Sequence, residues 1–512
     1  MRHLERIASA PVMTWSKRLA APAAIVVGAL LLRLIAGVGF VNYDTLYALA
    51  WGGQLSRGST PAYSVPIAPT PHPLIEILGL VLAPLGPKAI VAVTVALAFL
   101  ALTACAWVIY ALGGRWFGRA AGALAALLFI TRLPVLSYGV RAYIDIPYLL
   151  LVLAALLVES RRPRAGAPVL GLLAFAGLLR PEAWVFSGLY WLYLLELLPR
   201  VETVERPGGR PVRRLAPPRR RPRELFTGSH PAHLAGLTLL AASAPLVWLA
   251  SDLAVTGNPL WSLTNTRNTA AILDRVTGIA NVPEYIPRRI GEILRPPVLL
   301  GAAIGGVLSL LWLRRRALTG AVAGVVAVVV FAAFATVGLP INTRYAFLAS
   351  AILCIFCGAG VFGWTQLAPS DRRRRWWMAA SLVVVLAGIA FAPSEYHATH
   401  TELNKLATQQ RIEDDLVALV RSHAIALACG PVGVPNHAPI PLLALYLKTS
   451  PAEIISAQVH PIRDGTYVDP ASTEVQEDYV LDPHDPHLPV SVPPGFAKAT
   501  SNRSWVIFKR CA

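Results

Sequence analysis

The chain has 512 residues, of which 55% are hydrophobic and only 14% are charged, and its net charge is +18. A soluble domain carries about 25% charged residues, so the composition excludes an ordinary soluble protein. Apolar runs such as 21–38, 89–112 and 317–337 reach the roughly 20 residues that a transmembrane helix needs. The sequence therefore predicts an all-α polytopic membrane domain. Its positive charge gathers in short loops, which fits membrane topology and anionic lipids better than nucleic acid.

The apolar segments predict about eleven membrane spans. Their approximate ranges are 20–40, 88–112, 119–137, 147–159, 167–179, 183–198, 232–254, 297–313, 317–338, 344–366 and 376–392. Arginine clusters occupy every second gap between these spans, at 114–119, 161–164, 200–223, 314–316 and 372–375. Short loops rich in Lys and Arg stay in the cytoplasm, so the other loops are expected on the outer face of the cell membrane.

The first span is expected to be retained with the N-terminus inside the cell. Its apolar run is too long for the core of a signal peptide and lacks an obvious cleavage site. Arg2, Arg6, Lys17 and Arg18 precede it, which favours a cytoplasmic N-terminus. The segment 200–230 is dense in Arg and Pro and is expected to be disordered.

The last part of the chain, 393–512, predicts an extracytoplasmic domain of small α/β type, separate from the membrane domain 1–392. Helical spacing marks 401–422, and the apolar run 424–429 resembles a buried strand. Residues 442–447 suggest a helix and 504–509 a last strand.

The five cysteines fall into two groups. Cys105, Cys354 and Cys357 lie in apolar spans and are expected to be buried, inert thiols. Cys429 and Cys511 lie in the polar C-terminal region, where an oxidising outer compartment would make a disulfide between them plausible.

Two isolated aspartates stand at predicted span ends on the outer face. Asp44 follows the first span, and Asp145 precedes the span 147–159. Asp is a favoured helix N-cap, and local sequence alone favours that structural interpretation for Asp44. Asp145 could also be an N-cap, with Pro147 in the first turn. The alternative is functional, because ionisable groups at the membrane boundary are costly and usually paired or catalytic; Arg141 is a possible partner of Asp145.

Several short motifs occur in a characteristic order. They are Asp44 after the first span, the turn Gly114-Arg-Trp-Phe-Gly118, Asp145 before a Pro-bearing span, Arg-Pro-Glu-Ala-Trp at 180–184 and Thr-Arg-Tyr at 343–345. In this order the chain resembles the GT-C glycosyltransferases, over about residues 20–200. The branch concerned includes protein mannosyltransferases, the lipid A aminoarabinose transferase and actinobacterial cell-wall transferases. The first-loop motif of that family often carries a second acid, whereas Tyr43 and Thr45 flank Asp44 here, which departs from a two-carboxylate metal site.

The resemblance implies a hexosyl- or pentosyltransferase that uses a polyprenyl-phosphate sugar donor, inverts the anomeric centre and modifies a cell-envelope glycan, lipid or protein. It implies that Asp44 is the general base. Asp145 would orient the acceptor or help to hold a divalent cation, Mg²⁺ or Mn²⁺. Cationic groups should meet the leaving phosphate. The candidates are His72, Arg180, Arg267 and Arg344, and the expected substrate contacts are Tyr43, Arg141, Tyr143, Glu182 and Tyr345.

Each cationic candidate also has a structural interpretation. His72 stands between prolines and could be an exposed turn residue. Arg180 and Glu182 could simply pair with each other. Arg344 opens a span, where arginine snorkels to the interface. Arg267 lies in a polar loop, which is compatible with sugar binding and also with an ordinary polar surface loop.

Other histidines and other functions are less favoured. The pairs His397/His400 and His484/His487 have metal-like spacing but fit surface residues better.

The sequence has no phosphate-binding Walker motif, so ATP-driven transport by this chain alone is not supported. A transporter or flippase would place charges near the bilayer midplane, whereas here they gather at span ends. A non-catalytic envelope assembly protein is the third alternative.

Overall fold

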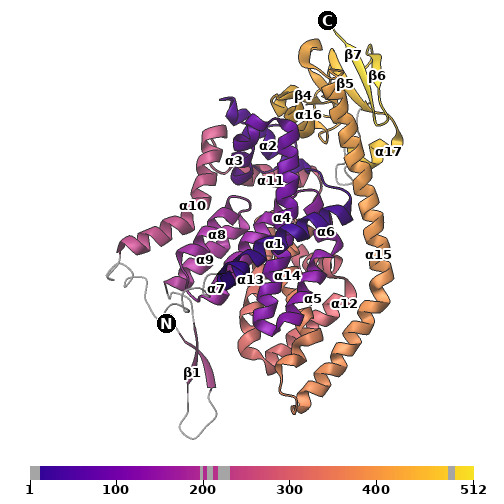
Figure 1. The fold of residues 1–512 in the computed structure, drawn as a ribbon. Coiled ribbons are helices and arrows are strands. Elements are labelled where there is room, and N and C mark those ends of the chain that lie inside the picture. The colour runs from indigo at the N-terminus through magenta and orange to yellow at the C-terminus, as the bar shows by residue number, and fades with distance from the viewer. Residues whose placement is uncertain (1–11, 196–199, 205–211, 217–230, 482–490, 512) are drawn as a thin grey trace, which may run out of the picture.

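The computed structural model describes residues 12–195, 200–204, 212–216, 231–481 and 491–511. Arg2, Arg6 and the pair His484/His487 lie outside these residues, as do the side chains of Lys17 and Arg18, so the expectations placed on them stay untested. Within the described ranges the chain forms a helical bundle with a small sheet at one end (Figure 1).

The bundle is built from fifteen α-helices in the described ranges. They are α1 (Val12–Ala36), α2 (Tyr43–Ser56), α3 (Pro73–Leu82), α4 (Pro87–Phe117), α5 (Arg119–Ile130), α6 (Leu133–Val140), α7 (Asp145–Arg161), α8 (Ala167–Gly177), α9 (Glu182–Leu194), α10 (Pro231–Thr256), α11 (Trp261–Ile272), α12 (Val282–Trp312), α13 (Arg314–Thr336), α14 (Phe347–Phe362) and α15 (Arg372–Arg421). A 3₁₀ turn, Thr343–Ala346, leads into α14.

Long apolar helices make the chain a multi-pass membrane protein. Among the described residues, six helices are long and apolar enough to cross a bilayer. A seventh span results if α5 and α6, which meet at a bend of 64°, are counted as one broken span. Every predicted span falls on a helix, but α7, α8 and α9 have only 17, 11 and 13 residues. The predicted count of eleven spans is therefore not confirmed.

The first predicted outer loop is not a loop but two closely packed helices, α2 and α3. Their contact depends on glycines. A Cβ atom on Gly52 would lie 2.2 Å from the backbone oxygen of Glu76, and one on Gly79 would lie 2.7 Å from that of Leu49. This close approach packs α2, whose first turn carries Asp44, against α3, which follows His72.

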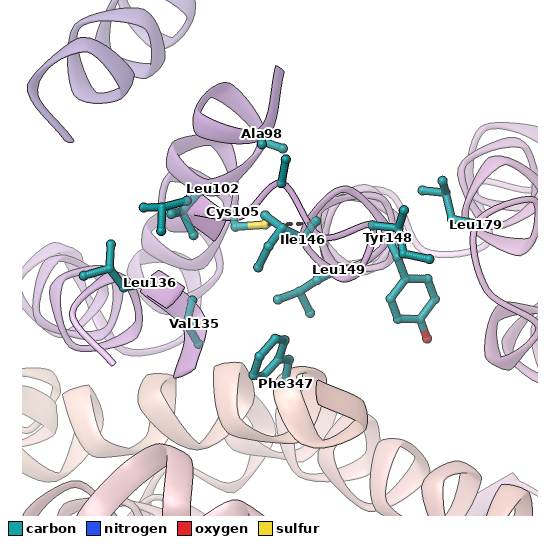
Figure 2. Packing of buried hydrophobic residues seen from close by; sticks show 14 of the residues in the cluster. Ala98, Leu102, Cys105, Val135, Leu136, Ile146, Tyr148, Leu149, Leu179 and Phe347 are labelled. Carbon is teal, nitrogen blue, oxygen red and sulfur yellow. Dashed lines mark hydrogen bonds between the residues drawn. The ribbon is translucent and has the colours of Figure 1, made fainter. Parts of the chain in front are cut away.

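The beginnings of α7 and α14 lie together in the bundle. Figure 2 shows Ile146 and Leu149 of α7 packed near Cys105 of α4 and Phe347 of α14. The Cys105 thiol contacts the Ile146 carbonyl at 3.6 Å. Because Ile146 follows Asp145 and Phe347 lies just after Arg344, this packing brings both polar side chains to the same end of the bundle. Cys105, Cys354 and Cys357 are buried free thiols.

The helix α15 connects the bundle to the C-terminal sheet without a break. It has 50 residues and runs from the far end of the bundle to the sheet (Figure 1). It is attached to α6 by polar contacts: Arg132, the N-cap of α6, pairs with Glu395 at 3.1 Å, and Ser137 donates to Glu402 at 2.9 Å. The predicted boundary at 392/393 thus falls inside one continuous helix.

The C-terminal region forms a mixed five-stranded sheet in the order β4-β3-β5-β7-β6. The strands are β3 (Val432–Val434), β4 (Ile454–Ser456), β5 (Gly465–Pro470), β6 (Ala497–Ser501) and β7 (Trp505–Arg510), with helices α16 (Ile440–Leu447) and α17 (Thr473–Val475). Strands β4 and β5 run parallel to β3, and β7 runs antiparallel to both β5 and β6.

Most elements predicted for this region are present, but one strand is displaced. The segment 424–429 is not a strand: residues 427–429 form a 3₁₀ turn, and β3 begins only after Gly430 and Pro431. Gly430 has a φ of +111°, so the chain turns there before it can enter the sheet. A disulfide joins Cys429 to Cys511, whose Cα atoms are 5.0 Å apart.

Part of the arginine-rich segment 200–230 has regular structure, contrary to the expectation of disorder. Strands β1 (Arg200–Val204) and β2 (Val212–Ala216) pair antiparallel. The first strand contains Val201, Thr203 and Val204 and the second begins with Val212, and these β-branched residues favour extended backbone. The hairpin lies at the opposite end of the molecule from the C-terminal sheet (Figure 1).

Candidate active site

Asp44 is not the cap of its helix. Asn42 is the N-cap of α2, and its side-chain oxygen accepts from the backbone amides of Asp44 at 2.8 Å and Thr45 at 3.3 Å. The Asn42 amide group in turn donates to the carbonyls of Arg141 and Ala142. The N-cap interpretation of Asp44 is therefore wrong. Because Asn42 makes the capping hydrogen bonds, the Asp44 carboxylate can contact another residue.

That partner is Arg344, 300 residues further along the chain. Its Nη1 donates to Oδ2 of Asp44 at 2.7 Å. Burial by itself raises the pKa of the Asp44 carboxyl, but the charge and hydrogen bond of Arg344 outweigh it and hold the pKa below its ordinary value. Asp44 is thus an ionised carboxylate at neutral pH.

Asp145 is likewise no cap, and its partner is not Arg141. Ile144 is the N-cap of α7, and the Asp145 carboxylate, 2% exposed, accepts from Nη1 of Arg180. Oδ2 of Asp145 lies 3.8 Å from Nη1 of Arg344. Arg344 therefore stands between the two aspartates.

Arg141 has a different environment. Its guanidinium lies over the rings of Tyr138 and Tyr143, at 5.3 and 4.9 Å from the ring centroids, and donates to Ser137. Stacking on two aromatic rings fixes its position by cation–π attraction.

Arg180 joins two carboxylates. Besides Asp145, it binds Glu182 through Nη2 at 2.6 Å, as the structural interpretation of that pair predicted. Its guanidinium also lies 4.3 Å from the centroid of the Tyr345 ring. Burial opposes the charge of Arg180, but the two carboxylates raise its pKa above the ordinary value, so it remains a cation.

A second network orients the turn that carries Arg344. Glu292 of α12 accepts from Thr343 at 3.0 Å and from Arg289 at 3.0 Å, and Arg289 also donates to the Ile341 carbonyl. The segment before α14 is thereby held on both sides of Asn342. This places the Arg344 side chain toward Asp44.

His72 is buried, not an exposed turn residue. It is 7% exposed, its Nδ1 has no hydrogen-bond partner among the described residues, and its ring meets Trp248 edge to face at 6.1 Å. Burial lowers the pKa of the imidazole to about 3 despite the nearby Asp44 carboxylate. His72 is therefore neutral at physiological pH and offers a hydrogen bond, not the charge expected from the sequence.

These residues surround one cavity of about 840 Å³. Its lining includes Tyr43, Asp44, His72, Arg141, Tyr143, Arg180, Glu182, Arg267, Arg344 and Tyr345, so every predicted site residue except Asp145 faces it. Asp145 lies directly behind, in contact with Arg180 and Arg344. Arg267 is exposed at the rim, where it donates to the Val337 carbonyl at 2.6 Å.

The cavity has two chemically different sides. We call the lining arginines and their carboxylate partners the floor; its arginines are Arg141, Arg180, Arg267, Arg275, Arg289 and Arg344. We call the lining residues of α15 and the C-terminal region the roof; they are Gln409, Glu413, His437, Ala438 and 479–481. Sequence inspection missed Arg275, Arg289, Glu413 and His437. No motif marked these four, because only tertiary packing brings them to the cavity.

The donor set does not suit a divalent cation. Such a cation needs several oxygen ligands, but Asp145 and Asp44 are engaged by Arg180 and Arg344. Across the described residues, no group of three His, Cys, Asp or Glu side chains could hold a metal ion. The histidines of the pair His397/His400 are exposed, and His400 contacts Asn404. We derive no catalytic step through a metal.

The structure has the fold of ArnT, in agreement with the GT-C-like architecture predicted from the sequence motifs. The crystal structure of ArnT from Cupriavidus metallidurans bound to undecaprenyl phosphate matches it with a TM-score of 0.54 at 14% sequence identity, covering 96% of this chain and 98% of ArnT. The apo structure of the same ArnT matches with a TM-score of 0.52 at 13% identity, covering 94% and 96%. No family model and no curated protein sequence matches this chain.

Proposed function

We propose that this protein transfers a sugar from a polyprenyl-phosphate donor to a hydroxyl group of a cell-envelope acceptor, with inversion. The observation that carries the proposal is the ionised Asp44 carboxylate held by Arg344 in a large cavity of a GT-C fold. The undecaprenyl phosphate bound to the similar ArnT supports a lipid-linked donor.

The proposed reaction is a single displacement. Asp44 accepts the proton of the acceptor hydroxyl while the oxygen of that hydroxyl attacks the anomeric carbon. The bond from that carbon to the phosphate oxygen breaks, and polyprenyl phosphate leaves with the electron pair. One displacement at the anomeric carbon inverts its configuration.

The floor arginines stabilise the leaving group in this proposal. Arg344 contacts Asp44 and lies 3.8 Å from Asp145, so a phosphate beside the attacked carbon would come within its reach. Arg binds phosphate oxygens in a bidentate manner. Arg180, held by Asp145 and Glu182, and the neutral His72 complete the polar surface around the same space. Fixed cations aimed at developing negative charge lower the barrier without reorganising.

The proposed orientation places the cavity on the outer face of the cell membrane. The arginine-rich hairpin β1–β2 and the C-terminal sheet lie at opposite ends of the bundle (Figure 1), and the helices α2 and α3 lie near the sheet end. With the arginine loops inside, the N-terminus is cytoplasmic and the cavity and the C-terminal region are extracytoplasmic.

The test is a transfer assay with purified protein. A panel of polyprenyl-phosphate sugars, including mannose and arabinose, is offered with envelope glycan acceptors, and the product is identified by mass spectrometry. We expect transfer with an inverted linkage, and equal rates with added Mg²⁺ and with EDTA. Absence of transfer with every donor, together with movement of the intact lipid across vesicles, would favour a flippase instead.

A further inference from the structure

The roof of the cavity differs from the floor in having no arginine or lysine among the described lining residues. All lining arginines precede residue 345, and the roof contributes Gln409, Glu413, His437 and Tyr479 as its polar groups. Glu413 is 8% exposed and His437 is 7% exposed, so both are buried side chains that nonetheless face the cavity.

The roof contacts the residue next to Asp44. The His437 ring meets the ring of Tyr43, the residue before Asp44, edge to face with centroids 5.5 Å apart. Asn436 holds this segment in place: its amide donates to the Val480 carbonyl, and its oxygen accepts from Ala438 at 3.0 Å.

A second contact ties the C-terminal region to the helix that carries the base. Gln54 of α2 donates to the Ser450 hydroxyl at 3.2 Å. On α15, the amide oxygen of Gln410 accepts a hydrogen bond from the backbone N–H of Gly39, which precedes α2, at 2.9 Å. The distance between roof and base is therefore set by packing, as an acceptor hydroxyl aimed at Asp44 would require.

The chemistry of the roof suits hydroxyl groups. Carboxyl, amide and imidazole groups exchange hydrogen bonds with hydroxyls in both directions. A phosphorylated acceptor would instead require charge-assisted bonds from cations, which the roof does not supply. In the proposed reaction Arg344 and Arg180 contact the donor phosphate, so these two arginines are not available to the acceptor.

We infer that the roof is the acceptor subsite and that it selects an uncharged, hydroxyl-rich glycan over a phosphorylated or otherwise anionic one. This inference rests on the proposed glycosyl transfer for its biological meaning. Glu413 and His437 bind acceptor hydroxyls and thereby determine acceptor specificity, while Asp44 beneath them takes the proton.

The test uses the full-length protein in detergent, an octyl hexoside as acceptor probe and its 6-phosphate as the anionic counterpart. Binding is measured with saturating polyprenyl phosphate, which occupies the floor, and is followed by the fluorescence of the cavity tryptophans, Trp184 and Trp248. Transfer is followed by kcat and acceptor KM. The variants are Glu413→Ala and His437→Ala. The matched controls Asp414→Ala and His460→Ala change exposed residues outside the lining.

We expect the neutral hexoside to bind the wild-type protein at least about tenfold more tightly than its phosphate. Each roof variant should raise the Kd and the acceptor KM about fivefold or more, because a hydrogen bond to a substrate is lost. The donor KM should stay constant and kcat should change less than about threefold, which is the pattern of lost ground-state binding. Both controls should behave as the wild type.

Equal or tighter binding of the phosphorylated hexoside would overturn the inference, as would unchanged acceptor KM in folded Glu413→Ala and His437→Ala. If a variant lost its thermal transition, His437→Asn and the preference of the wild-type protein between the two probes would decide. Hexoside binding that depends on Glu413 without any sugar transfer would refute the proposed transfer but leave the subsite intact. Transfer without dependence on the roof would refute the subsite alone.

Discussion

The floor and the roof of the cavity obtain their polarity in different ways. In the floor, buried charges are paired with each other: Asp44 with Arg344, and Asp145 and Glu182 with Arg180. In the roof, neutral and acidic groups are held by packing against the C-terminal sheet and by the contact of His437 with Tyr43.

The contrast shows how one cavity can treat two substrates differently. Paired charges are strongly interacting and costly to disturb, so in the proposed reaction the floor would keep a fixed electrostatic field for the charged leaving group. Neutral hydrogen bonds are individually weaker and provide selectivity by shape and by donor and acceptor pattern. Variants of the floor should therefore affect kcat, stability or pH dependence, and variants of the roof should affect acceptor KM.

The largest expected effect belongs to Asp44→Asn. We expect kcat to fall by about 10² to 10⁴, the range that general-base catalysis contributes. Donor binding should persist, since the arginines remain. The control is Asp371→Asn. Asp371 is the N-cap of α15, and Asn caps a helix equally well. Near-normal kcat in Asp44→Asn would remove the general-base assignment.

Arg344→Gln should lower kcat by about 10²- to 10³-fold, as loss of a charge-stabilising donor does. It should also change the pH profile. Arg344 holds the pKa of Asp44 below its ordinary value, and only the ionised base is active. Without Arg344, burial raises that pKa, so the acidic limb of kcat/KM moves to higher pH. Arg372→Gln, at an exposed arginine, should leave the pH profile unchanged. If the acidic limb of kcat/KM does not move in Arg344→Gln, Arg344 does not set the pKa of Asp44.

Arg180→Gln should act mainly on stability. It leaves the buried carboxylates of Asp145 and Glu182 without their partner, which costs about 3–5 kcal/mol for a broken buried pair. We expect a clear drop in Tm, measured by thermal denaturation in detergent. The double variant Arg180→Gln/Asp145→Asn should recover part of the lost Tm. Equal Tm values for the single and double variants would argue against an energetic coupling between Arg180 and Asp145.

The smallest effect is expected for His72→Gln. Because burial keeps His72 neutral, with a pKa of about 3, the substitution removes one neutral hydrogen bond and no charge. Such a loss corresponds to less than about tenfold in kcat/KM. A loss as large as that of Arg344→Gln would show that His72 becomes protonated when the donor binds, and would place it among the charged residues of the floor.

Local sequence determined the class of this protein. Hydropathy depends only on composition over some 20 residues, so long apolar helices could be predicted along the chain. Asp44 and Asp145 stood out because acids are rare at span ends, and the motif order predicted the GT-C fold. The same local information gave the wrong cap for α2, since Asn42 and Asp44 both favour that role and only the structure shows which side chain turns back.

Tertiary structure decided how these residues are paired. Arg344 meets Asp44 across 300 positions, and Arg180 replaces Arg141 as the partner of Asp145. Glu413 and His437 reach the cavity only because α15 carries the C-terminal sheet over α2. Periodicity and composition are properties of neighbouring residues, whereas a pair of charges or a cavity wall depends on how distant helices pack. The sequence by itself thus determined a membrane-embedded bundle with two notable aspartates, and packing alone made them the floor of a cavity with a distinct roof.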